Sequence, residues 1–195
     1  MKAVPNAEEL YIGNHFIQTY SGNRFEIEAP VFDVRDIAHA LSLVCRFGGH
    51  SSEFYSVAEH SILVHDLMAS LYPVADPIEG LLHDASEAYI GDLPSPFKGL
   101  MPSFQFFEQK LDTAIRKKFS LRPKRSNAEK HCDLLAVYIE AKVLMKDGGL
   151  CFENVNNYKE QADKLSEFHP IRCLTPMEAE IEFLKLTNHY GLNHV

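Results

Sequence analysis

A polar cluster set into an apolar helical segment constrains this chain more than any other feature of its sequence. The dipeptide His83-Asp84 follows two leucines, and Glu87 comes three residues later among alanines. Isolated charges in such surroundings are costly unless they are paired or bind a metal. The cluster therefore predicts a site rather than a simple packing surface.

Helix signals surround this cluster. Asp76 and Glu79 predict a capping box, and Pro77 suits the first helical position. Gly91 is a typical residue to end the helix, which gives one helix over about 77–90. In a continuous helix, residues three and four apart share a face, so His83, Asp84 and Glu87 would lie together.

Two further helix starts are predicted by capping boxes, at Ser56–Glu59 and at Ser126–Glu129. The first places His60 in the first turn of its helix. The second places Asp133 two turns into its helix, beside an apolar run.

Together these helices offer two imidazoles and two carboxylates, from His60, His83, Asp84 and Asp133. This donor set suits Zn, Mn, Co, Ni or Fe(II) better than Ca, which prefers oxygen ligands alone. Asp112 and Asp147 are alternative helical carboxylates for the place of Asp133. Each histidine taken singly could instead be a hydrogen-bonded core or surface residue.

In this order, the four residues resemble the HD-domain metal-dependent phosphohydrolase superfamily. Ser86-Glu87 and the segment 91–98 are similar to the small bacterial deoxynucleotide 5′-nucleotidases, and equally to the phage dATP triphosphohydrolases. The segments 36–42 and 45–50 resemble the compact phage-type branch. The resemblance covers roughly residues 15 to 145.

The resemblance implies catalytic roles for two acidic residues. Glu87 would orient or deprotonate the attacking water. Asp92 would donate a proton to the leaving oxygen, or hold the water or a second metal. The alternatives are a solvated helix residue for Glu87 and a loop residue for Asp92.

The resemblance also implies substrate contacts. Arg46 and Lys98 match phosphate-binding positions, and the arginine fork suits phosphate oxygens. Phe47 stands where several relatives have a tryptophan that packs on the sugar, which leaves the selectivity for deoxyribose open. His50 could touch the substrate.

Composition limits the other function classes. A formal net charge of −8 argues against a general nucleic-acid binder. No run approaches 18 consecutive apolar residues, so no membrane span is expected. The first ten residues lack an apolar signal region, and the four cysteines form no C-x-x-C pair, so a cytoplasmic location is expected, or the host cytoplasm if the chain is phage-encoded. The basic residues of 116–125 are expected to form a solvated face.

The predicted fold is mostly α: a single HD-domain multi-helix bundle over 1–195 with a short N-terminal β-hairpin. Its parts would be a hairpin region (1–30), a metal-site core (31–147) and C-terminal helices (150–195). Helices are expected over 34–46, 57–71, 77–90, 104–119, 127–146, 157–167 and 176–189, with a proline-rich loop over 91–102. Three aromatic residues are expected in the core or in a dimer interface, namely Phe104, Phe106 and Phe107.

The favoured function is a deoxynucleoside triphosphate triphosphohydrolase that releases deoxynucleoside and triphosphate from a dATP-like substrate. Additional Mg, Mn or Co ions would help to neutralise the triphosphate. The close alternative is a 5′-nucleotidase for deoxynucleoside monophosphates, and the alternative of another class is a non-catalytic metal-containing binding or scaffold protein. Relatives commonly form oligomers, so a homo-oligomer is expected.

Overall fold

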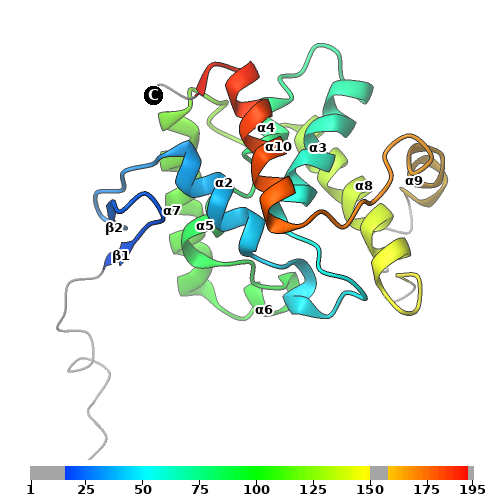
Figure 1. The fold of residues 1–195 in the computed structure, drawn as a ribbon, viewed down its shortest axis with the longest axis horizontal. Coiled ribbons are helices and arrows are strands. Elements are labelled where there is room, and N and C mark those ends of the chain that lie inside the picture. The colour runs from blue at the N-terminus through cyan, green and yellow to red at the C-terminus, as the bar shows by residue number, and fades with distance from the viewer. Residues whose placement is uncertain (1–15, 150–157, 193–195) are drawn as a thin grey trace, which may run out of the picture.

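The computed structural model describes residues 16–149 and 158–192, and it is mostly helical with one short hairpin (Figure 1). This confirms the predicted fold class. The elements are β1 (Phe16–Gln18), β2 (Arg24–Glu26), α2 (Val34–Leu43), the 3-10 helix η1 (Arg46–Gly49), α3 (Val57–Leu71), α4 (Ile78–Leu81), α5 (Glu87–Ile90), α6 (Ser95–Lys98), α7 (Pro102–Lys118), α8 (Asn127–Leu144), α9 (Lys159–Leu165) and α10 (Pro176–His189).

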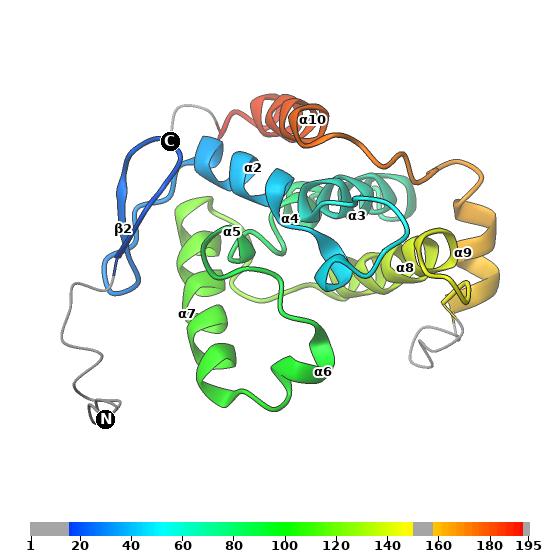
Figure 2. The same cartoon turned by 60° about the horizontal axis from the view of Figure 1, so that its bottom comes forward.

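Helix α3 is the centre of the bundle. It packs against α8 on one side and against α2 and α10 on another, and α4 also lies against it (Figure 2). Nearly every side of α3 is buried, as expected for an apolar helix inside a core. Its side chains join two apolar clusters: Val57 and Ile62 pack with α2, α4, α7 and α10, while Val64 and Leu67 pack with α8 and α9.

The predicted hairpin is present. Its strands pair antiparallel with Ile17 opposite Phe25, and Phe25 packs into the core. The turn is fastened to α2, because the backbone N–H and hydroxyl of Ser21 both donate to the buried Asp36 carboxylate. Residues 1–15 of the predicted hairpin region lie outside the described residues.

The expected single helix over 77–90 is wrong. The segment forms two short helices, α4 and α5, separated by a series of turns. The capping box predicted at its start is also wrong. Asp76 accepts from the N–H of Ile78, and the Glu79 carboxylate accepts from the backbone N–H of Arg122 instead of reaching back.

Two side chains take carbonyl groups that a continuous helix would use. In an α-helix, each carbonyl accepts from the N–H four residues later. The Gly80 carbonyl, which would pair with Asp84, lies 2.8 Å from Nδ1 of the His83 ring. The His83 carbonyl, which would pair with Glu87, accepts from the Arg125 guanidinium at 2.5 Å. The shared-face argument made for these residues from helical spacing therefore does not hold.

Helix α2 ends before the predicted limit of 34–46, because the chain turns to pair with a distant segment. The N–H of Arg46 donates to the Tyr55 carbonyl at 2.8 Å, and the N–H of Val57 donates to the Val44 carbonyl at 2.9 Å. Arg46 therefore lies in η1 rather than at a helix end. The other predicted helices match α3, α7, α8, α9 and α10 to within two residues at their described ends.

The region 91–118 departs from expectation in two ways. The predicted loop contains the short helix α6. Phe106 and Phe107 are 63% and 37% exposed, so their assignment to the core is wrong, and Phe104 is half-buried. A role for these side chains in a dimer interface stays a prediction.

The solvated basic face expected over 116–125 is also wrong in part. Arg116 is almost fully buried and pairs with Asp112 and Glu129. Arg125 reaches into the polar cluster described below.

No helix in the described parts of the chain combines the length and the apolar character that crossing a membrane requires.

A buried carboxylate ties the C-terminal segment to α3. The Ser56 hydroxyl caps α3 as predicted, by accepting from the N–H of Glu59. The Glu59 side chain does not complete the capping box. It accepts instead from three successive backbone N–H groups, those of Arg172, Cys173 and Leu174, at 2.7–3.0 Å.

We predict that Glu59→Gln lowers the free energy of unfolding by about 1–3 kcal/mol, because an amide NH₂ then faces a backbone donor. Chemical denaturation measures the change. Glu160→Gln is the matched control, since Glu160 forms an exposed pair with Lys164 on the same helix, and its effect should stay within about 0.5 kcal/mol. Equal stability of the two variants would contradict the role given to Glu59.

Candidate metal centre

Four side chains from three parts of the chain converge on one point. His60 comes from the first turn of α3, His83 and Asp84 from the turns after α4, and Asp133 from α8. The two imidazole Nε2 atoms lie 3.2 Å apart. Oδ2 of Asp84 lies 3.0 Å from His83 Nε2 and 3.6 Å from His60 Nε2. Oδ1 of Asp133 lies 3.3 Å from His60 Nε2 and 3.7 Å from His83 Nε2.

The spacing of these atoms suits a metal ion. His60, His83 and Asp84 each offer an atom within 4.8 Å of the others, and Asp133 joins them at the distances above. Both histidines are buried, whereas the Asp133 side chain is 27% exposed, so the site meets solvent on its carboxylate side. The structure thus brings together the whole predicted ligand set. Of the alternative carboxylates, Asp112 pairs with Arg116 on its own helix, and Asp147 accepts from the backbone N–H of Gly149.

A contact at Nδ1 fixes the orientation of each imidazole ring. Nδ1 of His60 lies 2.5 Å from Oε1 of Glu140, and Nδ1 of His83 lies 2.8 Å from the Gly80 carbonyl. Because both partners are acceptors, each neutral ring carries its hydrogen on Nδ1 and a lone pair on Nε2. The two lone pairs face each other, and a cation between them would relieve that repulsion.

The electrostatics of the cluster also favour a cation. Burial lowers the pKa of His83, but the Asp84 and Asp133 carboxylates outweigh burial and raise it to about 10. For His60, burial and Arg46 lower the pKa, but Glu140 and Asp133 raise it above its ordinary value. Burial raises the pKa of Asp84, yet His83 and Arg125 hold it well below its usual range. The carboxylates around the two imidazoles therefore favour positive charge at this point.

Glu140 is a residue that the sequence analysis missed. Its buried carboxylate accepts from Tyr55 at 3.1 Å and from Arg46 at 3.3 Å, besides facing His60. Burial raises the pKa of Glu140, but His60 and Arg46 lower it by more than burial raises it. The pKa of Glu140 therefore lies below its usual range. Glu140 lies seven residues after Asp133 on α8, and this two-turn spacing was a signal that could have identified it.

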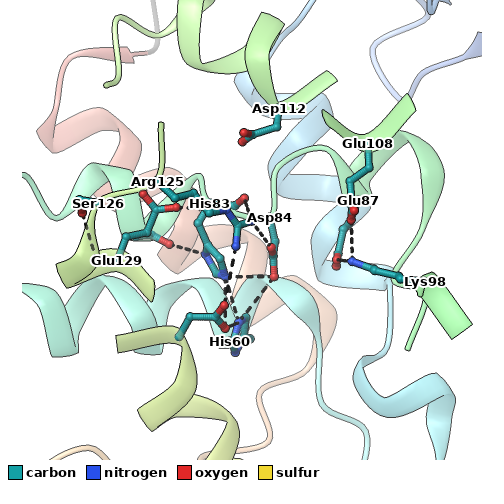
Figure 3. A network of polar contacts seen from close by, with 12 residues as sticks. His60, His83, Asp84, Glu87, Lys98, Glu108, Asp112, Arg125, Ser126 and Glu129 are labelled. Carbon is teal, nitrogen blue, oxygen red and sulfur yellow. Dashed lines mark hydrogen bonds and ion pairs between the residues drawn. The ribbon is translucent and has the colours of Figure 1, made fainter. Parts of the chain in front are cut away.

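Arg125 was also missed, and no pattern in the sequence identifies it. It directly precedes Ser126, the N-cap of α8. Figure 3 shows its side chain beside Asp84 and His83, with Glu129 next to it.

The predicted phosphate contact Arg46 lies at the edge of the cluster. Its side chain is 11% exposed, and Nη1 lies 3.8 Å from Asp84 Oδ2 and 3.9 Å from Asp92 Oδ2. The guanidinium also stands 5.5 Å from the centre of the Phe47 ring. Phe47 has a left-handed backbone with φ of 56°.

A second charged group lies beside the ligands. Lys98 of α6 donates to Glu87 at 3.2 Å and to Glu108 of α7 at 2.6 Å (Figure 3). Burial raises the pKa of Glu87 well above its ordinary value, and the carboxylates of Asp84 and Asp92 add to the rise. The alternative of a solvated Glu87 is wrong, because this residue is 2% exposed.

His50 differs from the other predicted site residues. It is exposed at the end of η1, and no contact between its ring and the four converging side chains is recorded among the described residues. Its contact with a substrate stays a prediction.

We predict that Glu140→Gln weakens the binding of Zn or Co about 10–100-fold, because the amide no longer fixes the His60 ring as a carboxylate does. Competition with a chromophoric chelator measures the dissociation constant. The control is Asp163→Asn, since Asp163 pairs with Lys142 of α8 at the surface. Unchanged affinity in a folded Glu140→Gln chain would refute the orienting role.

Comparisons with known proteins give the family of this chain. No model of a known protein family matches it. A solved structure of an HD phosphohydrolase of cyanophage S-2L, DatZ bound to dA and one catalytic Zn²⁺ ion, is similar over 78% of this chain and 95% of that chain, with 17% identity and a TM-score of 0.49. Similarity at that level carries no conclusion about this chain.

Two curated proteins share more of the sequence. An uncharacterized protein of Rhodobacter capsulatus is 34% identical over 110 residues, which cover 52% of this chain and 56% of that protein. YfdR of Escherichia coli K12, also described as uncharacterized, is 42% identical over 137 residues. The matched region covers 69% of this chain and 75% of YfdR. The chain therefore belongs to the same protein family as Escherichia coli YfdR.

Proposed function

We propose that this chain is a metal-dependent phosphohydrolase of the HD superfamily that acts on deoxynucleotides. The observation that carries the proposal is the convergence of two imidazole nitrogens and two carboxylate oxygens, from His60, His83, Asp84 and Asp133. Their order along the chain is the order of the HD resemblance. Basic side chains stand beside this donor set, as an anionic substrate requires.

The four side chains would hold a divalent transition ion such as Zn, Co, Mn, Ni or Fe. When bound, such an ion supplies positive charge that polarises a phosphoryl oxygen and makes a water easier to deprotonate.

Glu87 would act as the base toward the attacking water. One of its oxygens pairs with Lys98, and the other, Oε2, is buried without a hydrogen-bond partner among the described residues. That oxygen can accept a proton from water. Burial and the nearby carboxylates of Asp84 and Asp92 raise the pKa of Glu87 above its ordinary value, which makes its carboxylate a stronger base.

Asp92 would act as the acid that protonates the leaving group. Burial raises its pKa above the ordinary value, although Arg46 opposes the rise. A protonated Asp92 could donate to the leaving oxygen of the sugar. It could alternatively hold a water or a second divalent ion.

Arg46 and Lys98 would bind phosphate oxygens, with Phe47 beside the sugar and His50 at the rim. Both cations now face carboxylates, which a phosphate group would join or replace. Burial lowers the pKa of Lys98, but Glu87 and Glu108 outweigh burial and raise it above the ordinary value, so the ammonium keeps its charge.

In the favoured reaction, a water oxygen bonds to the α-phosphorus of a dATP-like triphosphate and the bond from phosphorus to the sugar oxygen breaks. The products are triphosphate, which now carries the water oxygen, and deoxynucleoside, whose sugar oxygen has taken up a proton. The resemblance to phage dATP triphosphohydrolases supports this substrate. Additional Mg, Mn or Co ions would neutralise the β- and γ-phosphates.

The second candidate is a 5′-nucleotidase for deoxynucleoside monophosphates. One observation favours it: Arg46, Lys98 and Arg125 each already have carboxylate partners. This arrangement leaves little protein charge for two further phosphates, whereas a monophosphate needs less.

We predict that chelator-stripped protein, resupplied with Zn, Mn or Co together with Mg, hydrolyses deoxynucleotides. Product analysis with separate dNMPs, dNTPs and rNTPs distinguishes the two candidates. Triphosphate from dATP with little turnover of dAMP supports the favoured reaction. Inorganic phosphate from dNMPs alone supports the nucleotidase, and no turnover under any condition refutes both.

We predict that Glu87→Gln lowers kcat about 10²–10⁴-fold, because the amide cannot accept the proton of water. The variant should keep its metal content and its circular dichroism spectrum. The control is Glu182→Gln, because Glu182 of α10 forms a half-exposed pair with Arg172 of the preceding segment. This variant should keep full activity. Full activity of Glu87→Gln would refute the role of Glu87 as the base.

A further inference from the structure

We infer that Arg125 is a positioning residue that turns one oxygen of each carboxylate ligand toward the metal and holds the other oxygen away from it. The inference rests on the proposed function, because it takes Asp84 and Asp133 as ligands. It goes further by giving a task to a residue outside the ligand set.

The two carboxylates divide their oxygens in the same way. Oδ2 of Asp84 faces the imidazole nitrogens, while Oδ1 accepts from Arg125 Nη2 at 2.9 Å. Oδ1 of Asp133 faces the imidazole nitrogens, while Oδ2 lies 3.7 Å from Arg125 Nη1. One guanidinium thus faces the outer oxygen of both carboxylates. It donates a hydrogen bond to that of Asp84 and lies within ion-pair distance of that of Asp133, and its planar fork of donors allows both contacts.

The guanidinium is itself held in place. Nη2 also donates to the His83 carbonyl at 2.5 Å, and Nε lies 3.3 Å from Oε1 of Glu129. Glu129 is fully buried and is fixed by Arg116 at 2.6 Å. This network spans the loop before α8 and the turn that carries His83 and Asp84 (Figure 3). Arg125 therefore has contacts that fix its position independently of any ion.

Holding the outer oxygens has a consequence for coordination. With one oxygen from each carboxylate, the protein supplies four ligand atoms, and one water would complete a five-coordinate centre that can still accept substrate. If both carboxylates bound through two oxygens, the protein would supply six atoms and would fill an octahedral shell. We therefore assign to Arg125 the task of keeping the centre open.

The test uses Co(II) as the probe, since its visible absorption is stronger with four or five ligands than with six. Stripped wild-type chain, Arg125→Met and Arg122→Met are each titrated with Co(II) to saturation. We expect the molar absorption of Arg125→Met to fall at least about twofold, because coordination number and geometry set the band intensity. Arg122→Met should match the wild type: Arg122 lies in the same loop, is 62% exposed and pairs with Glu79 instead.

A folded Arg125→Met chain with the wild-type spectrum would overturn the inference while leaving the proposed function intact. If Arg125→Met does not fold, the comparison is made with Arg125→Lys, which keeps the charge but has one ammonium in place of the fork. An unchanged spectrum for that variant would overturn the inference too. Failure of the wild-type chain to bind Co(II) would overturn both the inference and the proposed function.

Discussion

The pairing of two buried imidazoles, each held through Nδ1, is the constraint on which the rest of this structure depends. His60 and His83 present Nε2 to the same point only because Glu140 and the Gly80 carbonyl fix their rings. The hydrogen bond to Gly80 takes a backbone acceptor that a continuous helix would use. The break between α4 and α5 is therefore part of the construction of the site.

The buried charged groups around the site are the second constraint on this structure. Removing a carboxylate or a guanidinium from water is expensive unless each has a partner. Glu140 is matched by Arg46 and Tyr55, and Glu129 by Arg116 and Arg125. Although the whole chain is acidic, with a net charge of −8, its site is surrounded by local cations.

Two helices that pack on each other, α3 and α8, supply three of the residues in this network. Helix α3 supplies His60, and α8 supplies both Asp133 and Glu140, and these two helices pack directly on each other. The residue before His60, Glu59, binds three backbone N–H groups of the C-terminal segment. The position of α3 is thus fixed from the site on one side and from the C-terminal segment on the other.

The sequence by itself determined the starts of α3 and α8, because an N-cap bond joins residues three apart. Ser56 and Ser126 cap their helices as expected, and Thr175 caps α10. The sequence also identified the four converging side chains, because a polar or charged group in apolar surroundings is costly unless it is paired or binds a metal. The roles of these side chains as ligands remain a proposal.

Only the tertiary structure decided which partner each charged group meets. Arg125 and Glu140 contact site residues brought from other parts of the chain. The spacing on α8 places Glu140 on the face of Asp133, but it does not specify the contact with His60. The same holds for the break in the predicted helix over 77–90, where side-chain contacts replaced helical hydrogen bonds. Local spacing determines caps and helix faces, whereas pairing in a buried network depends on distances that exist only after the helices have packed.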